Sequence, residues 1–574
     1  MSIIPLWLFF SFASSEPCRP DAVFAAVRSA TGGDRWNAVG GIIGDGDASA
    51  AGLQGPAHVS IDVRTGRSAE RADLPFVHET RVYDGRTQWI VNGEDGVHPL
   101  DAPDAAAGAR TDAYLARRGY FSPATDPADF ACLDEGADGA RHFDVVRVTP
   151  HNARPVDVWV DQQTHRIART VQRTPTVSEI TTYADYRDVD GIALPFLRTT
   201  ADDDGSGAET VRFVNYHVVP HARDSDFIRP PEPTNFRMNG GATSTTVPIS
   251  LDNGILSVLA TVDGKGPFPF ILDTGGHAIL TLDTLATLGL SAVGKSESGG
   301  GGEGKTAVQF AQSRSIRIGD AELLGIPMTV LGIHGDELGP HPAGAPPLAG
   351  ILGLEVFERF AVRVDYIRKT LTLTPLRTFR YHGSGVPLRL VFQQDAPLVD
   401  AQADGYDGLF MIDTGNSGTT ILIGHFLEQH GFFDRYHDGI ASTGGGTGGV
   451  VHASTQALDR LTIAGQTLHN FPASFVVQQR GSFSSLTEAG NIGTAVLSQF
   501  TPTFDYRDET IYFERENGAP IAPQSRAGFS YSQTADGMTI GTVLPQSAAA
   551  VAGLTALCPS APQGCSPWVE PGAR

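Results

Sequence analysis

FILDTGG at residues 270–276 and FMIDTGN at residues 410–416 are two copies of one short pattern, and they decide the fold of this 574-residue chain. Each copy is an apolar, strand-like run that ends in Asp-Thr-Gly. The two acidic residues, Asp273 and Asp413, are separated by 140 positions. A lone Asp-Thr-Gly is a weak signal in a long chain, so the interpretation depends on what else repeats at the same distance.

A second motif repeats with the same separation of 140 residues. ILG at residues 351–353 and NIG at residues 491–493 each place a glycine 80 residues behind the aspartate of their own copy. Both regions are rich in short strand-like runs punctuated by glycine. The chain therefore contains an internal repeat, whose two units span residues 245–378 and 385–516.

The apolar run into Asp-Thr-Gly, the Gly-rich segment behind it and the later apolar-Gly motif together resemble the retropepsin-like aspartic proteases. The resemblance covers residues 245–378 and 385–516, and the three features recur in the same order in both. It implies a mainly β fold with two closed β-barrel units of the acid-protease type in tandem. The units would pair inside one chain as a pseudo-dimer. A homodimer, in which each unit pairs with its copy in another chain, stays open.

The resemblance implies that Asp273 and Asp413 form the catalytic pair. Two carboxyl groups that share one proton cannot both ionise cheaply, so one pKa rises and the other falls. The ionised group would activate a water molecule, and the protonated group would polarise the carbonyl of a peptide bond. The sequence does not tell which aspartate is protonated. The expected substrate is a polypeptide, and no metal or organic cofactor is needed because the nucleophile is water.

The residues that flank the aspartates have physical roles in this family. Thr274 and Thr414 carry hydroxyls that hydrogen-bond across the pair of loops. Gly275 and Gly415 let backbone N–H groups approach the carboxylates without a Cβ in the way. The apolar-Gly motifs would pack beneath the aspartate loops and brace them. Their four residues are Leu352, Gly353, Ile492 and Gly493.

One position departs from the family pattern. The family often has Ser or Ala after the glycine of Asp-Thr-Gly, whereas this chain has Gly276 and Asn416. Gly276 supplies no hydroxyl to Asp273, so the charge of that carboxylate should be less stabilised. Carboxyl groups without extra donors titrate near 4 or above. We therefore expect a pH optimum that is mildly acidic to near neutral.

Two Gly-rich stretches, Ser298–Gly304 and Thr443–Gly449, are candidates for flaps over the aspartates. A lid must open for substrate and close to exclude water, and glycine makes such hinges. An ordinary surface loop is the alternative interpretation.

GGGGEGKT at residues 299–306 formally matches the phosphate-binding P-loop pattern. A P-loop follows a buried strand and opens a long helix. Here the preceding residues are polar, and residues 308–318 are typical of strands and turns. Nucleotide binding is therefore not expected.

Charge and targeting signals indicate an exported protein. Lys and Arg total 42 and Asp and Glu total 64, so the net charge is −22, which argues against a nucleic-acid partner and an anionic membrane surface. Residues 1–15 are typical of a signal peptide, and no run is long enough to span a membrane. We expect a periplasmic or secreted location. Cys18 and Cys132 could then form a disulfide, and Cys558 and Cys565 lie in the tail.

The repeat is flanked by two further segments. Residues 16–235 predict a β-rich α+β domain, with a helix at residues 19–30, and resemble periplasmic lipoprotein-carrier proteins. A β-rich pro-segment or spacer is the alternative. Residues 526–574 resemble the first half of a PDZ domain that lacks its last strands. A competing function also remains: an exported lipid- or peptide-binding protein in which the repeat is a catalytically inactive scaffold.

Overall fold

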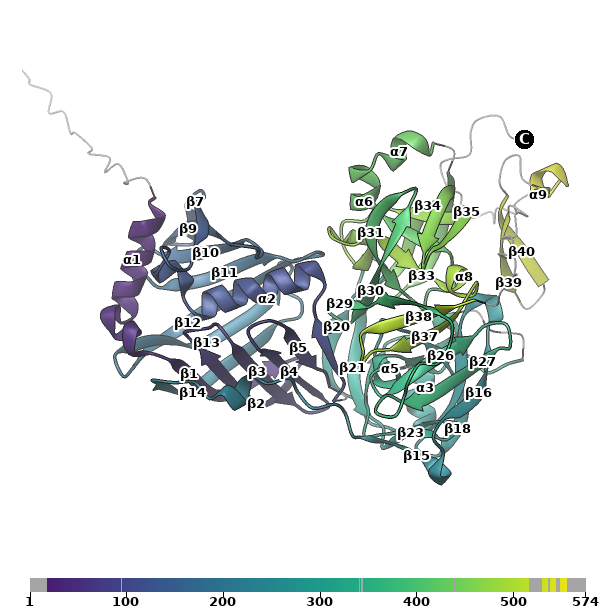
Figure 1. Ribbon diagram of the computed structural model, residues 1–574, viewed down its shortest axis with the longest axis horizontal. Coiled ribbons are helices and arrows are strands. Elements are labelled where there is room, and N and C mark those ends of the chain that lie inside the picture. The colour runs from purple at the N-terminus through teal and green to yellow at the C-terminus, as the bar shows by residue number, and fades with distance from the viewer. Residues whose placement is uncertain are drawn as a thin grey trace, which may run out of the picture.

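A computed structural model shows a mainly β protein with two lobes that lie side by side (Figure 1). The structure describes residues 18–93, 95–339, 341, 344–437, 439–515, 529–534, 537–543 and 548–554. The expected signal peptide lies outside these residues. No helix within the described residues is both long and apolar enough to cross a membrane.

In the first lobe, one antiparallel sheet carries two helices. The helices are α1 Pro20–Thr31 and α2 Pro103–Ala116. The strands are β1 Gly41–Ala50, β2 Leu53–Asp62, β3 Ser68–Leu74, β4 Val77–Tyr83, β5 Gln88–Val91, β6 Val97–Leu100, β7 Ala128–Cys132, β8 Gly136–Asp138, β9 Arg141–Pro150, β10 Val156–Asp161, β11 Ile167–Arg173, β12 Ser178–Val189, β13 Ile192–Asp202 and β14 Glu209–Val219. The strand order is β6-β5-β4-β3-β2-β1-β14-β13-β12-β11-β10-β9-β7, with β8 beside β9.

Helix α1 is held to this sheet by apolar packing. Its one-sided spacing buries Val23, Phe24 and Val27 against a cluster that includes Tyr114 of α2 and Val158 of β10. These side chains leave water together, which is the main favourable term in docking a helix on a sheet. The helix predicted at residues 19–30 is thus present, shifted by one residue at each end.

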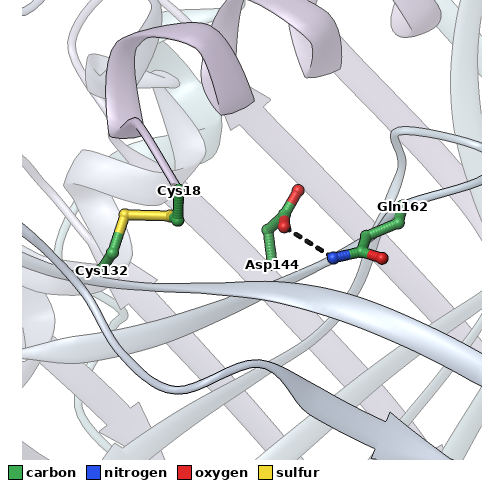
Figure 2. Close-up of a disulfide and its surroundings, with 4 residues drawn as sticks. All are labelled: Cys18, Cys132, Asp144 and Gln162. Atoms are coloured by element: carbon green, nitrogen blue, oxygen red, sulfur yellow. Dashed lines mark hydrogen bonds between the residues drawn. A yellow bond between two sulfur atoms is a disulfide. The ribbon is translucent and has the colours of Figure 1, made fainter. Parts of the chain in front are cut away.

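A disulfide ties the start of α1 to the edge of the sheet (Figure 2). Cys18 precedes the helix, Cys132 ends β7, and the two are 114 residues apart in sequence. Gln162 donates a hydrogen bond to Asp144 nearby, at 2.9 Å. The disulfide closes a long loop, so it removes much conformational freedom from the unfolded chain.

The second lobe holds the repeat. Its strands are β15 Phe236–Met238, β16 Thr245–Ser250, β17 Ser257–Val262, β18 Lys265–Leu272, β19 Ile279–Leu280, β20 Val293–Ser298, β21 Thr306–Gln312, β22 Ser315–Ile318, β23 Ala321–Leu324, β24 Pro327–Leu331, β25 Gly350–Leu352, β26 Phe360–Asp365, β27 Thr370–Pro375, β28 Val386–Arg389, β29 Val391–Gln393, β30 Ala396–Ala403, β31 Tyr406–Ile412, β32 Thr420–Ile423, β33 Ile440–Gly446, β34 Gly449–Ile463, β35 Gln466–Val476, β36 Gly490–Ile492, β37 Thr501–Asp505 and β38 Thr510–Glu514. Its helices are α3 Leu282–Leu288, α4 Gly335–Leu338, α5 Leu354–Phe357, α6 Gly424–Gln429, α7 Phe432–Arg435 and α8 Thr494–Leu497.

The two repeat units share a sheet. Strand β26 of the first unit pairs with β37 of the second, and Val362 lies opposite Phe504. Strands β28, β37 and β38 of the second unit therefore continue the sheet of the first. One apolar cluster also runs through both units, and it includes Phe270 and Phe410. The sequence predicted two closed barrels in tandem that pair as a pseudo-dimer, and it gave no sign of this pairing between β26 and β37.

The described part of the tail is a hairpin and a short helix. Strands β39 Phe529–Thr534 and β40 Gly537–Val543 pair with each other, and α9 Ala548–Val551 follows. Cys558 and Cys565 lie outside the described residues.

We predict that loss of the Cys18–Cys132 disulfide destabilises the first lobe by about 2–5 kcal/mol, because the reduced chain regains loop entropy. Urea unfolding of wild type and of a Cys18→Ser, Cys132→Ser variant would measure this. Reductant should shift the wild-type midpoint and leave the variant unchanged. Equal midpoints for both proteins would contradict the prediction.

Candidate active site

The first aspartate follows the end of a buried strand. Strand β18 ends at Leu272 and runs parallel to β25, with Leu272 opposite Leu352. The N–H of Asp273 then donates to the carbonyl of Leu352 at 2.9 Å. A Cβ at Gly353 would lie 1.9 Å from the carbonyl oxygen of Gly276, so only glycine fits there.

The second aspartate is held in the same way. Strand β31 ends at Ile412 and runs parallel to β36, with Ile412 opposite Ile492. The N–H of Asp413 donates to the carbonyl of Ile492 at 3.0 Å. A Cβ at Gly493 would lie 2.8 Å from the carbonyl oxygen of Asn416. The two apolar-Gly motifs thus lie directly beneath the two aspartate loops, residues 273–276 and 413–416.

Two threonines join the aspartate loops by four reciprocal hydrogen bonds. The backbone N–H of Thr274 donates to Oγ1 of Thr414 at 3.1 Å, and the N–H of Thr414 donates to Oγ1 of Thr274 at 3.1 Å. The Thr274 hydroxyl donates to the carbonyl of Ile412 at 2.5 Å, and the Thr414 hydroxyl to that of Leu272 at 2.8 Å. Both threonines are fully buried, so this exchange has no competition from water.

The carboxyl group of Asp273 lies against the opposite loop. A Cβ at Gly415 would lie 2.5 Å from Oδ2 of Asp273, so the absence of a side chain there makes room for this carboxyl. Burial and the charge of Asp413 raise the pKa of Asp273 to about 7. Burial also raises the pKa of Asp413. The structure therefore brings the two half-buried aspartates into one site, where the charge of Asp413 acts on Asp273.

The two aspartates have different hydrogen-bond partners. Asp273 Oδ1 accepts from the backbone N–H of Gly275 at 2.9 Å. Asp413 accepts from the backbone N–H of Asn416 at 2.9 Å and from Nδ2 of Asn491 at 2.6 Å. These donors counter the effect of burial on the pKa of Asp413, because they favour its charged form.

The two Gly-rich segments are hairpin tips that meet. One tip joins β20 to β21 and the other joins β33 to β34. The N–H of Gly302 donates to the carbonyl of Thr447 at 3.0 Å, and that of Gly304 to the carbonyl of Gly448 at 2.9 Å. Residues 299–305 lead into strand β21, whereas the residues that follow a P-loop form a helix.

The first lobe contacts the first of these hairpins. Asp204 pairs with Lys305 at 2.5 Å and with Arg480 at 2.8 Å. At the base of the hairpin, the N–H of Lys295 donates to the carbonyl of Ala51 at 2.7 Å. The hairpin is thus held at its tip and at its base by residues outside the repeat.

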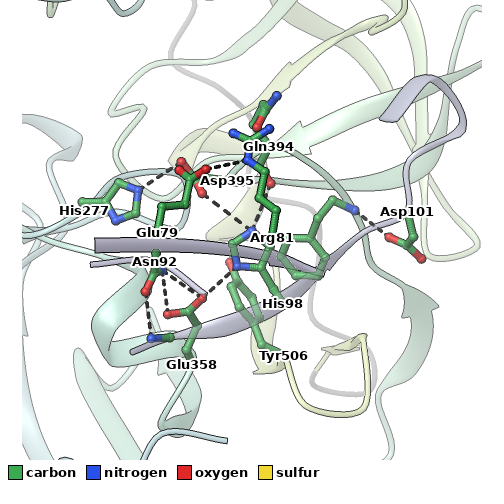
Figure 3. Close-up of polar contacts among 12 residues, drawn as sticks. Glu79, Arg81, Asn92, His98, Asp101, His277, Glu358, Gln394, Asp395 and Tyr506 are labelled. Carbon is green, nitrogen blue, oxygen red and sulfur yellow. Dashed lines mark hydrogen bonds and ion pairs between the residues drawn. The ribbon is translucent and has the colours of Figure 1, made fainter. Parts of the chain in front are cut away.

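A partly buried polar network joins the two lobes (Figure 3). His98 of β6 lies 2.8 Å from Glu358, which follows α5, and both side chains are fully buried. His277, which follows the first aspartate loop, lies 3.0 Å from Asp395, and His98 lies 3.6 Å from the same carboxylate. Asn92 donates to Glu358 at 3.2 Å. The first lobe therefore reaches the edge of the aspartate site through charged groups.

The pKa of His98 reflects two opposing effects. Burial alone would lower the pKa of this imidazole, but the hydrogen bond and charge of Glu358 and the charge of Asp395 outweigh burial and raise it. Burial would raise the pKa of Asp395, yet the charges of His277 and His98 hold it well below its usual range.

The sequence interpretation missed two residues of the site. Asn491 belongs to the NIG motif, but the sequence analysis predicted no role for its side chain. A comparison of the two units could have indicated one, because the residue 140 positions earlier is the apolar Ile351. The sequence analysis predicted no role for Tyr506. Its hydroxyl donates to the carbonyl of Thr274 at 3.0 Å, a contact that depends on the shared sheet.

Comparison with known proteins identifies an aspartic protease-like region. A family model described as aspartyl protease matches residues 258–356, which include Asp273 and Gly353. A search of curated proteins finds no match.

Similarity to solved structures is weak. An aspartic proteinase from Irpex lacteus is 16% identical, with 48% of this chain and 98% of that chain covered and a TM-score of 0.33. A LolA superfamily protein from Nitrosomonas europaea is 12% identical, with 36% and 97% covered and a TM-score of 0.27. A putative outer membrane lipoprotein-sorting protein domain from Vibrio parahaemolyticus is 11% identical, with 36% and 95% covered and a TM-score of 0.26. All three TM-scores are below 0.5, so none of these likenesses supports a conclusion about this chain.

We predict that Thr274→Val destabilises the second lobe by about 2–5 kcal/mol, because it leaves a buried N–H and a buried carbonyl of the opposite loop without partners. Thr274→Ser is the matched control, since it keeps the hydroxyl and loses only a methyl group. Urea unfolding of both variants would measure the difference. A serine variant as unstable as the valine variant would assign the effect to packing instead.

A second prediction concerns pH. The His98–Glu358 pair contributes stability that is present below about pH 6.5 and is lost as pH rises through the raised pKa of His98. The melting temperature of wild type should therefore exceed that of His98→Gln most strongly near pH 6, with the gap narrowing toward about pH 9. A gap that stays constant over this range would contradict the prediction.

Proposed function

We propose that this protein is an aspartic-type endopeptidase that hydrolyses peptide bonds in polypeptides at one site, formed by Asp273 and Asp413 of the same chain. The observation that carries this proposal is the reciprocal threonine exchange, which holds two half-buried carboxyl groups in adjacent loops. The aspartyl protease match at residues 258–356 supports it independently.

The proposed reaction needs only water and the two carboxyl groups. The ionised aspartate takes a proton from water while the water oxygen bonds to the peptide carbonyl carbon. The protonated aspartate donates its proton to the carbonyl oxygen, which gives a neutral tetrahedral diol. The proton taken from water then passes to the amide nitrogen as the C–N bond breaks. The aspartate that began protonated takes back a proton from a hydroxyl of the diol, so the site returns to its starting state.

The surroundings of the site fit this reaction. The hairpin tips at residues 299–305 and 446–449 are the proposed flaps, which would open for an extended peptide and close to exclude water. Residues 245–378 and 385–516 are the two proposed half-sites, and the bracing motifs are part of each. A chain that builds both halves works as a monomer, which is our proposal for this protein.

The disulfide supports an oxidising compartment. Disulfides persist in the periplasm and outside cells, and they are rare in a reducing cytosol. With the signal-like residues 1–15, this favours a periplasmic or secreted location. We assign residues 16–235 to a separate N-terminal domain and residues 526–574 to a PDZ-like remnant.

We predict that wild type cleaves denatured casein and that Asp273→Asn and Asp413→Asn each abolish cleavage, because both carboxyl groups serve one site. Cleavage between about pH 3 and pH 7, followed by gel electrophoresis, would test this. If each variant keeps about half of the activity, the units act as two sites in a homodimer. If wild type does not cleave and lipid co-purifies with it, the binding-protein alternative gains.

We predict a bell-shaped pH profile for kcat/KM. Activity falls at high pH as the protonated aspartate ionises, above the usual range of a carboxyl group, because burial raises the pKa of both aspartates. It falls at low pH as the base becomes protonated, and these limits belong to the coupled pair. The optimum should therefore be mildly acidic to near neutral. An optimum below about pH 3 would contradict the raised pKa values of both groups.

A further inference from the structure

The two repeat units differ at the positions that surround their aspartates. Asn491 of the second unit corresponds to Ile351 of the first, and Asn416 corresponds to Gly276. At these two positions the second unit has amide side chains near Asp413, whereas the first unit has glycine and isoleucine. A difference confined to one half of a pair of repeats points to unequal roles for the two aspartates.

The amides of Asn416 and Asn491 form a directed hydrogen-bond chain that ends on Asp413. The backbone N–H of Gly418 donates to Oδ1 of Asn416 at 2.8 Å, which fixes the orientation of that amide. Nδ2 of Asn416 then donates to Oδ1 of Asn491 at 2.8 Å. Nδ2 of Asn491 must therefore face Asp413, and it donates to Oδ2 at 2.6 Å.

This hydrogen-bond chain starts from the backbone N–H of Gly418, whose direction of donation is fixed. A backbone N–H is only a donor, so neither amide can flip to offer an oxygen to Asp413 without losing its own partner. Asn491 is 3% exposed, so water does not replace the bond to the carboxylate. A fixed, buried donor stabilises the ionised form of its acceptor and gives no stabilisation of this kind to a carboxyl O–H.

We propose that Asn491 is a positioning residue that keeps Asp413 ionised as the water-activating base, so that the shared proton resides on Asp273. This inference rests on the proposed peptidase function and adds the assignment of roles. Asp273 lacks an equivalent side-chain amide, because Ile351 occupies the corresponding position. Its carboxyl group also lies against the loop of Asp413 at Gly415, where the neighbouring charge favours its protonated form.

Other titratable groups lie around the pair. Tyr366 and Tyr506 are buried, and burial raises the pKa of each phenol, so both stay neutral throughout the active range. A charge on His277 favours ionisation of Asp273 and therefore opposes the assignment. Asp395 lies 3.0 Å from His277 and offsets that charge.

The test measures each carboxyl group separately. The protein is labelled with ¹³C at the aspartate carboxyl carbons, and the titration midpoint of each carboxyl group is measured by NMR. In the Asp273→Asn variant only Asp413 of the pair can titrate, and in the Asp413→Asn variant only Asp273 can. We expect Asn491→Leu, a substitution of similar shape without a donor, to raise the titration midpoint of Asp413 by about one to two pH units. The midpoint of Asp273 should stay where it is. Ile351→Leu, the matched control, should move neither midpoint.

A kinetic measurement complements the titration. With both aspartates present, Asn491→Leu should move the acidic limb of the kcat/KM profile to higher pH. A merely structural role would instead lower activity equally at every pH. An unmoved Asp413 midpoint, or equal movement of both aspartates, would overturn the inference. The shorter donor in Asn491→Ser gives an intermediate shift if the leucine variant folds poorly.

The titration does not depend on turnover. If wild type cleaves no polypeptide, the proposed function fails, and the midpoints still decide whether Asn491 holds Asp413 ionised. If wild type cleaves and the midpoints do not respond to Asn491→Leu, only the assignment of roles fails.

Discussion

The exchange of hydrogen bonds between Thr274 and Thr414 is the constraint on which the site depends. Two carboxyl groups brought together in a dry environment repel each other when both are charged, and burial penalises each charge. A structure that keeps them together must hold the two loops by other means. Here each threonine bonds to the backbone of the opposite loop, so the loops cannot separate without exposing unpaired buried groups.

The rest of the second lobe supports that exchange from both sides. Beneath the loops, the parallel pairs β18–β25 and β31–β36 fix where each strand ends, and Gly353 and Gly493 allow the close backbone contact. Farther out, the β26–β37 pairing makes the halves one sheet, which lets Tyr506 of the second unit bond to Thr274 of the first. The relative placement of the aspartates is thus set by hydrogen bonds in which the backbone takes part, both between strands and with the side chains of Thr274, Thr414 and Tyr506.

Local sequence predicted the parts of the fold that are local, and it missed the parts that arise between distant segments. The repeat places Thr274 and Thr414 at equivalent positions, and the resemblance to the aspartic proteases implied that their hydroxyls hydrogen-bond across the pair of loops. The one-sided apolar spacing of residues 19–30 was enough to predict α1. The β26–β37 pairing and the His98–Glu358 pair each join residues more than 100 positions apart, and no periodic pattern in the sequence indicates which distant residues will pair. The repeat shows that Asn491 differs from its counterpart Ile351, but its role could be inferred only from the direction of the hydrogen bonds in the structure.

A single chain can do what a symmetric dimer of identical units cannot. In a homodimer the residue at the position of Asn491 would stand beside both aspartates, so the sequence could not favour either one as the base. Here the two halves are encoded separately, and the amide donors of Asn416 and Asn491 occur in one half only. The site can therefore carry a fixed asymmetry, with one carboxylate stabilised and the other left to hold the proton. That asymmetry is a physical reason for the duplicated unit to diverge at these positions while its Asp-Thr-Gly sequences stay the same.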